Sequence, residues 1–170
     1  MLVFLFGYPG VGKNYVGEIL RNDFNFFFYD GDSDLGSEIE TAIREGKLFS
    51  DQQRDEFFHR LITSTKKASC EHQNVVVSQT LAKNKSQKAM SEKFPDAVFI
   101  RIVVPMEIIR KRLKNRKDHL VPLEYAEKVF KYFEEPEIQH EVLHNDGDKE
   151  KIRTQLNKIL NSTSPVKRER

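Results

Sequence analysis

Five short apolar runs occur along the chain, and longer stretches with helical spacing of their apolar residues separate them. The runs occupy residues 2–6, 26–29, 74–78, 97–104 and, with weaker alternation, 138–145. The helical stretches are one that begins near Gly12, followed by 51–69, 86–93, 106–115, 123–134 and 148–160. Continuous apolar strands that alternate with helices are typical of a parallel sheet covered on both faces. The pattern therefore predicts an α/β fold, a three-layer sandwich around a five-stranded parallel sheet.

Length, charge and cysteine content narrow the kinds of protein that the chain can be. Its 170 residues fit one domain, expected over residues 1–161, and the polar tail 162–170 is expected to be disordered. The 28 basic and 26 acidic residues nearly balance, which favours neither a nucleic-acid nor a membrane partner. No apolar run approaches the roughly 20 residues of a membrane span. The single cysteine, Cys70, fits the reducing environment of the cytoplasm.

A glycine-rich segment joins the first apolar run to the first helical stretch. Its sequence, GYPGVGKN at residues 7–14, has the pattern G-x-x-x-x-G-K, which usually ends in Ser or Thr. Glycines there let backbone N–H groups turn inward around an anion, and the helix N-terminus adds partial positive charge. We therefore expect a nucleotide-binding loop rather than a strand-to-helix turn that binds nothing. Its members are Gly7, Tyr8, Pro9, Gly10, Val11, Gly12, Lys13 and Asn14, with Lys13 reaching the outer phosphates.

Asn14 occupies the position where a Ser or Thr hydroxyl normally binds Mg²⁺. The Asn side chain also offers an oxygen ligand, but it is longer and uncharged. Because Mg²⁺ depends mainly on phosphates, carboxylates and water, we expect its binding to be weakened or rearranged rather than abolished. The alternative is a degenerate protein that binds nucleotide without turning it over.

Polar residues also follow the second and third apolar runs. Asp30 and Asp32 end the second run, and Ser78–Thr80 end the third. The carboxyl ends of parallel strands meet at one edge of a sheet, so these residues should converge with the glycine-rich loop on one crevice. One Asp could hold Mg²⁺ through water, and the other could accept a hydroxyl proton. The alternative is that the acidic run only caps the next helix, a role that we expect of Asp34.

Four segments resemble, in order and spacing, those of the gluconokinase branch of the small-molecule kinases, relatives of shikimate kinase and the nucleoside monophosphate kinases. They are FYDGD (28–32), GKLFSDQQRDEFF (46–58), VVVSQTLAKNK (75–85) and RLKNRKDHLVPLEYAEKVFKYFEEPE (112–137). The resemblance runs from the loop to about residue 136. It implies a P-loop NTPase fold of the nucleoside monophosphate kinase type, with a lid at about residues 112–123. It also implies ATP and Mg²⁺ as cofactors, a small acid as acceptor with gluconate first, and a possible homodimer.

The same resemblance implies roles for individual residues. Asp32 corresponds to the base and substrate anchor, and Asp30, with Asn14, to the metal partner. Arg54 corresponds to the arginine that binds the acid, for which a bidentate guanidinium is suited. The remaining matches are Lys13, Arg112 and Arg116 as catalytic cations, the last two on the lid, and Lys83 and His119 on the substrate side.

Departures from the family pattern leave the acceptor open. The second Asp is followed by SDLGSEIE rather than an aromatic-His-Pro segment, and SQTLAK (78–83) keeps only Leu81 and Lys83 of the family's sugar-acid stretch. Shikimate and nucleoside monophosphates are the alternative acceptors. The first is disfavoured because no Gly-Gly turn follows the third run, and the second because 32–60 holds few arginines. A nucleotide-dependent switch is the third alternative, but the guanine-reader-like NRKD (115–118) follows a helix instead of a strand.

Overall fold

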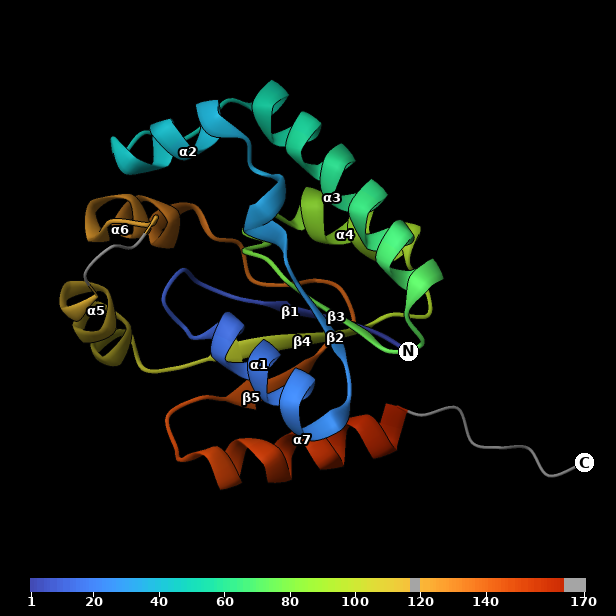
Figure 1. Ribbon diagram of the computed structural model, residues 1–170. Helices are drawn as coiled ribbons and strands as arrows, with labels where there is room; N and C mark the ends of the chain where they lie inside the picture. The colour runs from blue at the N-terminus through green and yellow to red at the C-terminus, as the bar shows by residue number, and fades with distance from the viewer. Residues whose placement is uncertain (117–119, 164–170) are drawn as a thin grey trace, which may run out of the picture.

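A five-stranded parallel sheet forms the middle layer of the protein (Figure 1). The computed structural model describes residues 1–116 and 120–163. The strands lie in the order β2-β3-β1-β4-β5, so the first strand is central. Their bounds are Leu2–Phe6 for β1, Phe27–Asp30 for β2, Val75–Ser78 for β3, Val98–Val103 for β4 and Glu141–His144 for β5. The predicted five-stranded parallel sheet is therefore confirmed, including the weak fifth run.

Helices cover both faces of this sheet, as predicted. One face carries α1, α5 and α7, and the other carries α2, α3 and α4, while α6 contributes side chains to both cores, Ala126 to the first and Tyr125 and Val129 to the second. The bounds are Lys13–Phe24 for α1, Ser37–Arg44 for α2, Asp51–Glu71 for α3, Asn84–Lys93 for α4, Met106–Asn115 for α5, Leu123–Tyr132 for α6 and Lys149–Thr163 for α7. In the part of the chain that the structure describes, no helix combines the length and apolar character needed to cross a membrane.

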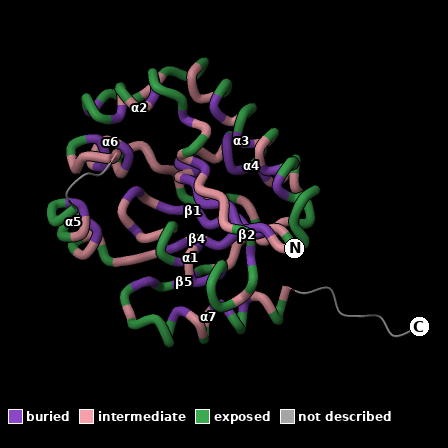
Figure 2. The backbone as a smooth tube through the Cα atoms, viewed as in Figure 1, coloured by how far each residue is buried: buried purple, intermediate pink, exposed green. Residues whose placement is uncertain are grey.

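The central strand β1 divides its side chains between two hydrophobic cores. Val3 and Leu5 pack with α1 and α7, whereas Phe4 and Phe6 pack with α2, α3 and α4. Successive strand residues point to opposite faces, so a strand between two helical layers must be apolar throughout. Figure 2 shows buried residues in the middle of the sheet, where β1, β3 and β4 lie, with exposed residues on the outer sides of the helices.

The segment after β2 contains two short elements that the sequence pattern did not predict. Residues Gly31–Asp34 form a 3₁₀-helix, and α2 follows with Ile39 and Ile43 buried on one face. The expectation that Asp34 caps the next helix is wrong, because α2 begins after Gly36. The Asp34 carboxylate instead accepts hydrogen bonds from the Tyr29 hydroxyl, at 2.8 Å, and from Ser64, at 2.9 Å.

The structure also bears on the expected lid and on the expected tail. The first part of the expected lid, Arg112–Asn115, is the last turn of α5. The expected tail begins too early, because Ser162 and Thr163 belong to α7, where their hydroxyls donate to the carbonyl of Ile159 at 2.9 and 2.8 Å. The remaining tail residues, 164–170, lie outside the described residues.

Candidate active site

The glycine-rich loop is held from behind by the end of β5 and by α5. The carbonyl of Val11 accepts hydrogen bonds from the side-chain amide of Asn145, at 2.7 Å, and from Arg112, at 3.2 Å. Gly12 has φ 90°, and a Cβ atom there would lie 2.3 Å from Nδ2 of Asn145. Gly12 is also the N-cap of α1, and among the described residues no side chain caps the first N–H groups of that helix. The loop thus presents an open helix N-terminus, which suits an anion.

Lys13 folds back over this loop and uses its three donors within the site. Its Nζ donates to the carbonyl oxygens of Gly7 at 3.2 Å and Tyr8 at 3.0 Å, and to the Thr80 hydroxyl at 3.1 Å. Burial lowers the pKa of Lys13 from 10.5 to about 8, although the nearby carboxylates of Asp32 and Asp30 oppose the shift. An entering phosphate group would replace weak carbonyl partners with a charged one and so favour the protonated ammonium.

The three strand ends converge, as expected from the sequence. Asn14 bridges two of them: its Nδ2 donates to Asp30 at 2.6 Å, and its Oδ1 accepts from the Ser78 hydroxyl at 2.7 Å. Asp30 also accepts the backbone N–H of Asp32 at 3.1 Å, which caps the 3₁₀-helix. Asp30, rather than Asp34, is therefore the capping residue of the acidic run.

The oxygen atoms of this cluster are of the kind that Mg²⁺ prefers. Magnesium usually takes one or two protein ligands and completes its shell with phosphates and water. Asp30 supplies the carboxylate, and Asn14 and Ser78 supply neutral oxygens beside it. Across residues 1–116 and 120–163, no three His, Cys, Asp or Glu side chains are grouped as a metal site. The donor set thus fits a metal held mainly by nucleotide phosphates, not a protein-enclosed ion.

Asp32 lies half-buried on the wall of a cavity that also opens onto the loop. Its Oδ1 accepts from the side-chain amide of Gln79 at 3.2 Å. Burial, and to a smaller extent the charge of Asp30, raises the pKa of Asp32, while Lys13 and the Gln79 hydrogen bond oppose that rise. A carboxyl with a raised pKa is a better proton acceptor than a fully solvated one.

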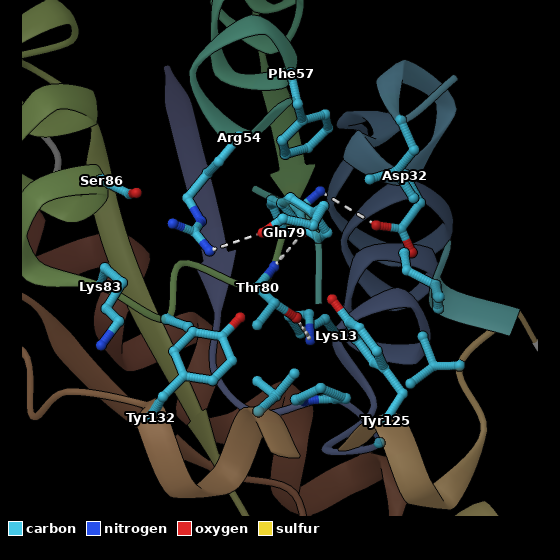
Figure 3. A pocket seen from close by; sticks show the side chains of 18 of the residues that line it. Lys13, Asp32, Arg54, Phe57, Gln79, Thr80, Lys83, Ser86, Tyr125 and Tyr132 are labelled. Carbon is cyan, nitrogen blue, oxygen red and sulfur yellow. Dashed lines mark hydrogen bonds between the residues drawn. The ribbon is translucent and has the colours of Figure 1, made fainter. Parts of the chain in front are cut away.

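Arg54 lines the same cavity from the first turn of α3, and its position follows from the start of that helix. Ser50 and Gln53 form a capping box, in which each side chain bonds the backbone N–H of the other. The guanidinium contacts Asp51 and lies 5.4 Å from the ring centroid of Phe49. The Arg54 side chain is only 19% exposed, so it is directed inward rather than into solvent (Figure 3).

Aromatic side chains close the cavity around these polar groups, and the sequence reasoning missed them. Tyr125 and Tyr132 project from α6 opposite Phe57 of α3, and Val129 of the same helix also lines the cavity. Burial raises the pKa of both tyrosine hydroxyls, so they remain neutral. Spacings of four and three residues along 125–132 indicate a single helix face, and this was the signal available in the sequence.

Of the remaining predicted residues, two line the cavity and one lies behind the glycine-rich loop. Lys83 lines the cavity and pairs with Glu134 at 3.0 Å. Arg116 lines the cavity near the loop. Arg112 lies behind the loop, where it contacts Val11 and donates to the carbonyl of Asn145 at 2.8 Å. His119 lies outside the described residues.

The fold and the glycine-rich loop define the class of P-loop proteins, and comparison with known proteins agrees with this class. The model of the AAA domain family matches residues 3–142, and the chain belongs to this family. A shikimate kinase of Clostridium botulinum (strain Alaska E43 / Type E3) is 25% identical over 166 residues, 93% of this chain and 96% of its own. A probable gluconokinase of Xenopus tropicalis is 22% identical over 165 residues, 88% of this chain and 87% of its own.

The fold likeness extends to solved structures. An unliganded sugar kinase from Janibacter sp. HTCC2649 has a TM-score of 0.81 at 18% identity, over 96% of this chain and 98% of that one. The predicted resemblance to P-loop kinases of the shikimate kinase and gluconokinase type is thereby confirmed.

Proposed function

We propose that the protein is an ATP-dependent, cytoplasmic small-molecule kinase that transfers the γ-phosphoryl group to a hydroxyl of a small acid. The observation that carries this proposal is the meeting of Lys13, Asp32 and Arg54 on one cavity, beside an open helix N-terminus. The loop amides bind the triphosphate, and Lys13 neutralises its outer oxygens. Asp30 and Asn14 would hold Mg²⁺, which would supply further charge neutralisation.

The acceptor binds at the end of the cavity opposite the glycine-rich loop. Arg54 binds the carboxylate of the acid, while Asp32 accepts the proton of the hydroxyl that attacks the γ-phosphorus. Arg116 stabilises the charge that develops on the transferred group, and Lys83 contributes to acceptor binding from the rim. Arg112 acts through the loop backbone that it contacts.

Gluconate is the first acceptor that we propose, because the resemblance covers the whole order of segments and a probable gluconokinase aligns over most of the chain. A cyclic acid such as shikimate is the second candidate. It is favoured by the aromatic walls at Phe57, Tyr125 and Tyr132, since flat apolar surfaces suit a ring better than an open polyol.

A coupled assay of ADP release, run with gluconate, related sugar acids, shikimate and nucleoside monophosphates, tests this function. We expect one acid to stimulate turnover above basal ATP hydrolysis. Asp32→Asn should then reduce kcat by about 100-fold or more and leave ADP affinity within threefold. The matched control is Asp96→Asn, which replaces an exposed carboxylate before β4. Absence of stimulation by every acceptor would instead favour a nucleotide-binding module.

A further inference from the structure

Two uncharged residues after β3 connect the carboxylate of Asp32 to the ammonium of Lys13. From the Asp32 end, the Gln79 amide donates to Asp32 Oδ1 at 3.2 Å, and Gln79 Oε1 accepts the backbone N–H of Thr80 at 2.6 Å. The Thr80 hydroxyl then accepts from Lys13 Nζ at 3.1 Å. Figure 3 shows Gln79 and Thr80 lying between the two charged side chains.

The direction of every hydrogen bond in this connection is determined by its chemistry. A backbone N–H can only donate, so the group of Gln79 that faces Thr80 must be its oxygen. The amide NH₂ of Gln79 must therefore face Asp32, as a carboxylate requires. A protonated lysine also only donates, so the Thr80 hydroxyl is its acceptor. Donor and acceptor therefore cannot exchange roles in any hydrogen bond between Asp32 and Lys13.

Burial and hydrogen bonds hold Gln79 in one orientation. Gln79 is a buried polar residue, at 6% exposure, and its own backbone N–H donates to the carbonyl of Leu5 in β1 at 3.0 Å. Both the oxygen and the nitrogen of this buried amide are hydrogen-bonded. A change of rotamer would leave them without partners, which is energetically costly in the protein interior. Asp32, by contrast, lies on a short 3₁₀-helix, and its carboxylate accepts a side-chain hydrogen bond from Gln79.

We propose that Gln79 is a positioning residue, which together with Thr80 forms a hydrogen-bonded bridge that orients Asp32 and Lys13 relative to each other. This inference rests on the proposed phosphoryl transfer. Asp32 accepts the proton of the attacking hydroxyl, and Lys13 neutralises the phosphate group that this hydroxyl attacks. The distance between the two side chains must therefore be controlled. The bridge sets that separation without placing a third charge between them.

Steady-state kinetics of substitutions at Gln79 test the bridge. Gln79→Met keeps the length of the side chain and removes both hydrogen bonds. Gln79→Glu keeps the acceptor for Thr80 but turns a carboxylate toward Asp32. We expect kcat to fall about 10- to 100-fold in both variants, with ADP affinity and the KM for ATP within threefold of wild type.

Gln87→Met is the matched control for loss of a buried glutamine. Gln87 is fully buried on α4, donates to the carbonyl of Leu81 at 2.8 Å and does not line the cavity. Its replacement should lower the melting temperature and leave kcat within threefold. If Gln79→Met lowers kcat no more than Gln87→Met does, the bridge has only a structural role and the proposal is wrong.

The Thr80 end of the bridge has its own pair of variants. Thr80→Val is nearly isosteric and removes the acceptor for Lys13, whereas Thr80→Ser retains it. We expect Thr80→Val to reduce kcat about tenfold and Thr80→Ser to restore it to within threefold of wild type. Equal activity of the two variants contradicts the Lys13 contact.

A measurement that needs no turnover separates this inference from the proposed function. The side-chain amide signal of Gln79 in a ¹⁵N–¹H spectrum is identified by its loss in Gln79→Met. Asp32→Ala should shift it, and Asp96→Asn should not; an unmoved signal shows that the bridge is absent. A wild type without acceptor-stimulated turnover overturns the proposed function and with it the catalytic role of the bridge. Full turnover in Gln79→Met overturns the bridge alone.

Discussion

Substitution of Gly12 by alanine tests how the glycine-rich loop is supported. The added methyl group would meet Asn145 at 2.3 Å, on a residue whose φ is 90°. A non-glycine residue with left-handed backbone geometry costs about 1–2 kcal/mol. Displacing Asn145 also breaks its buried hydrogen bond to Val11, which costs about 1–3 kcal/mol. We therefore expect Gly12→Ala to lower the free energy of unfolding by about 2–5 kcal/mol.

Thermal unfolding followed by circular dichroism measures this loss. For a chain of this size, each kcal/mol corresponds to about 2–4 °C, so the melting temperature should fall by about 4–20 °C. Gly147→Ala is the control near the same end of the sheet. Its added Cβ meets the flexible side chain of Lys151, at 2.6 Å from Cδ, which can move aside.

A double-mutant cycle with Asn145→Ala separates the two contributions. In the Asn145→Ala background the clash is relieved, so Gly12→Ala should cost only the backbone term, about 1–2 kcal/mol. An equal cost of Gly12→Ala in both backgrounds would refute the argument that Asn145 supports the loop through close contact. The same variants should weaken ADP binding in proportion to the disturbance of the loop.

Three further predictions concern the polar and charged residues of the site. Asn14→Ser removes the amide that links Asp30 to Ser78 and should lower the Mg²⁺ concentration needed for half-maximal ATP binding; an identical magnesium titration would mean that Asn14 is not near the ion. Because the pKa of Lys13 is about 8, its ammonium is already charged below that pH, and above it ADP binding must take up a proton. In calorimetric titrations without Mg²⁺, the Kd for ADP should therefore rise above pH 8 by up to about tenfold per pH unit, and in Lys13→Met the rise should disappear. Arg54→Lys should raise the KM for the acid acceptor about 10- to 100-fold through loss of bidentate binding, and an unchanged acceptor KM with a changed ATP KM would place Arg54 at the wrong end of the cavity.

The strands and the loop could be predicted because their signals are local. An apolar run followed by glycines and a lysine needs no knowledge of distant residues. The convergence of Asn14, Asp30 and Ser78 also followed, since parallel strands bring their carboxyl ends together. These are properties of sheet topology, which the order of segments determines.

Other parts of the site depend on contacts that local patterns do not contain. Helix α2 spans eight residues and carries a single buried pair, Ile39 and Ile43, too little for a periodic signal. Segment 78–80 was identified as lying at the crevice, but only the packed structure turns the Gln79 amide toward Asp32. Similarly, the cations of the expected lid are chemically alike in sequence, and only their packing separates Arg112 behind the loop from Arg116 on the cavity.

The two hydrophobic cores on opposite sides of the sheet have an evolutionary consequence. The helix that begins at the glycine-rich loop, α1, is anchored in one core, and the helices at the proposed acceptor end of the cavity, α2 and α3, are anchored in the other. Substitutions in the core of α2 and α3 can therefore accumulate without disturbing the packing of α1 beneath the glycine-rich loop. For the proposed kinase, such a partition would allow acceptor specificity to change while the phosphate donor stays the same.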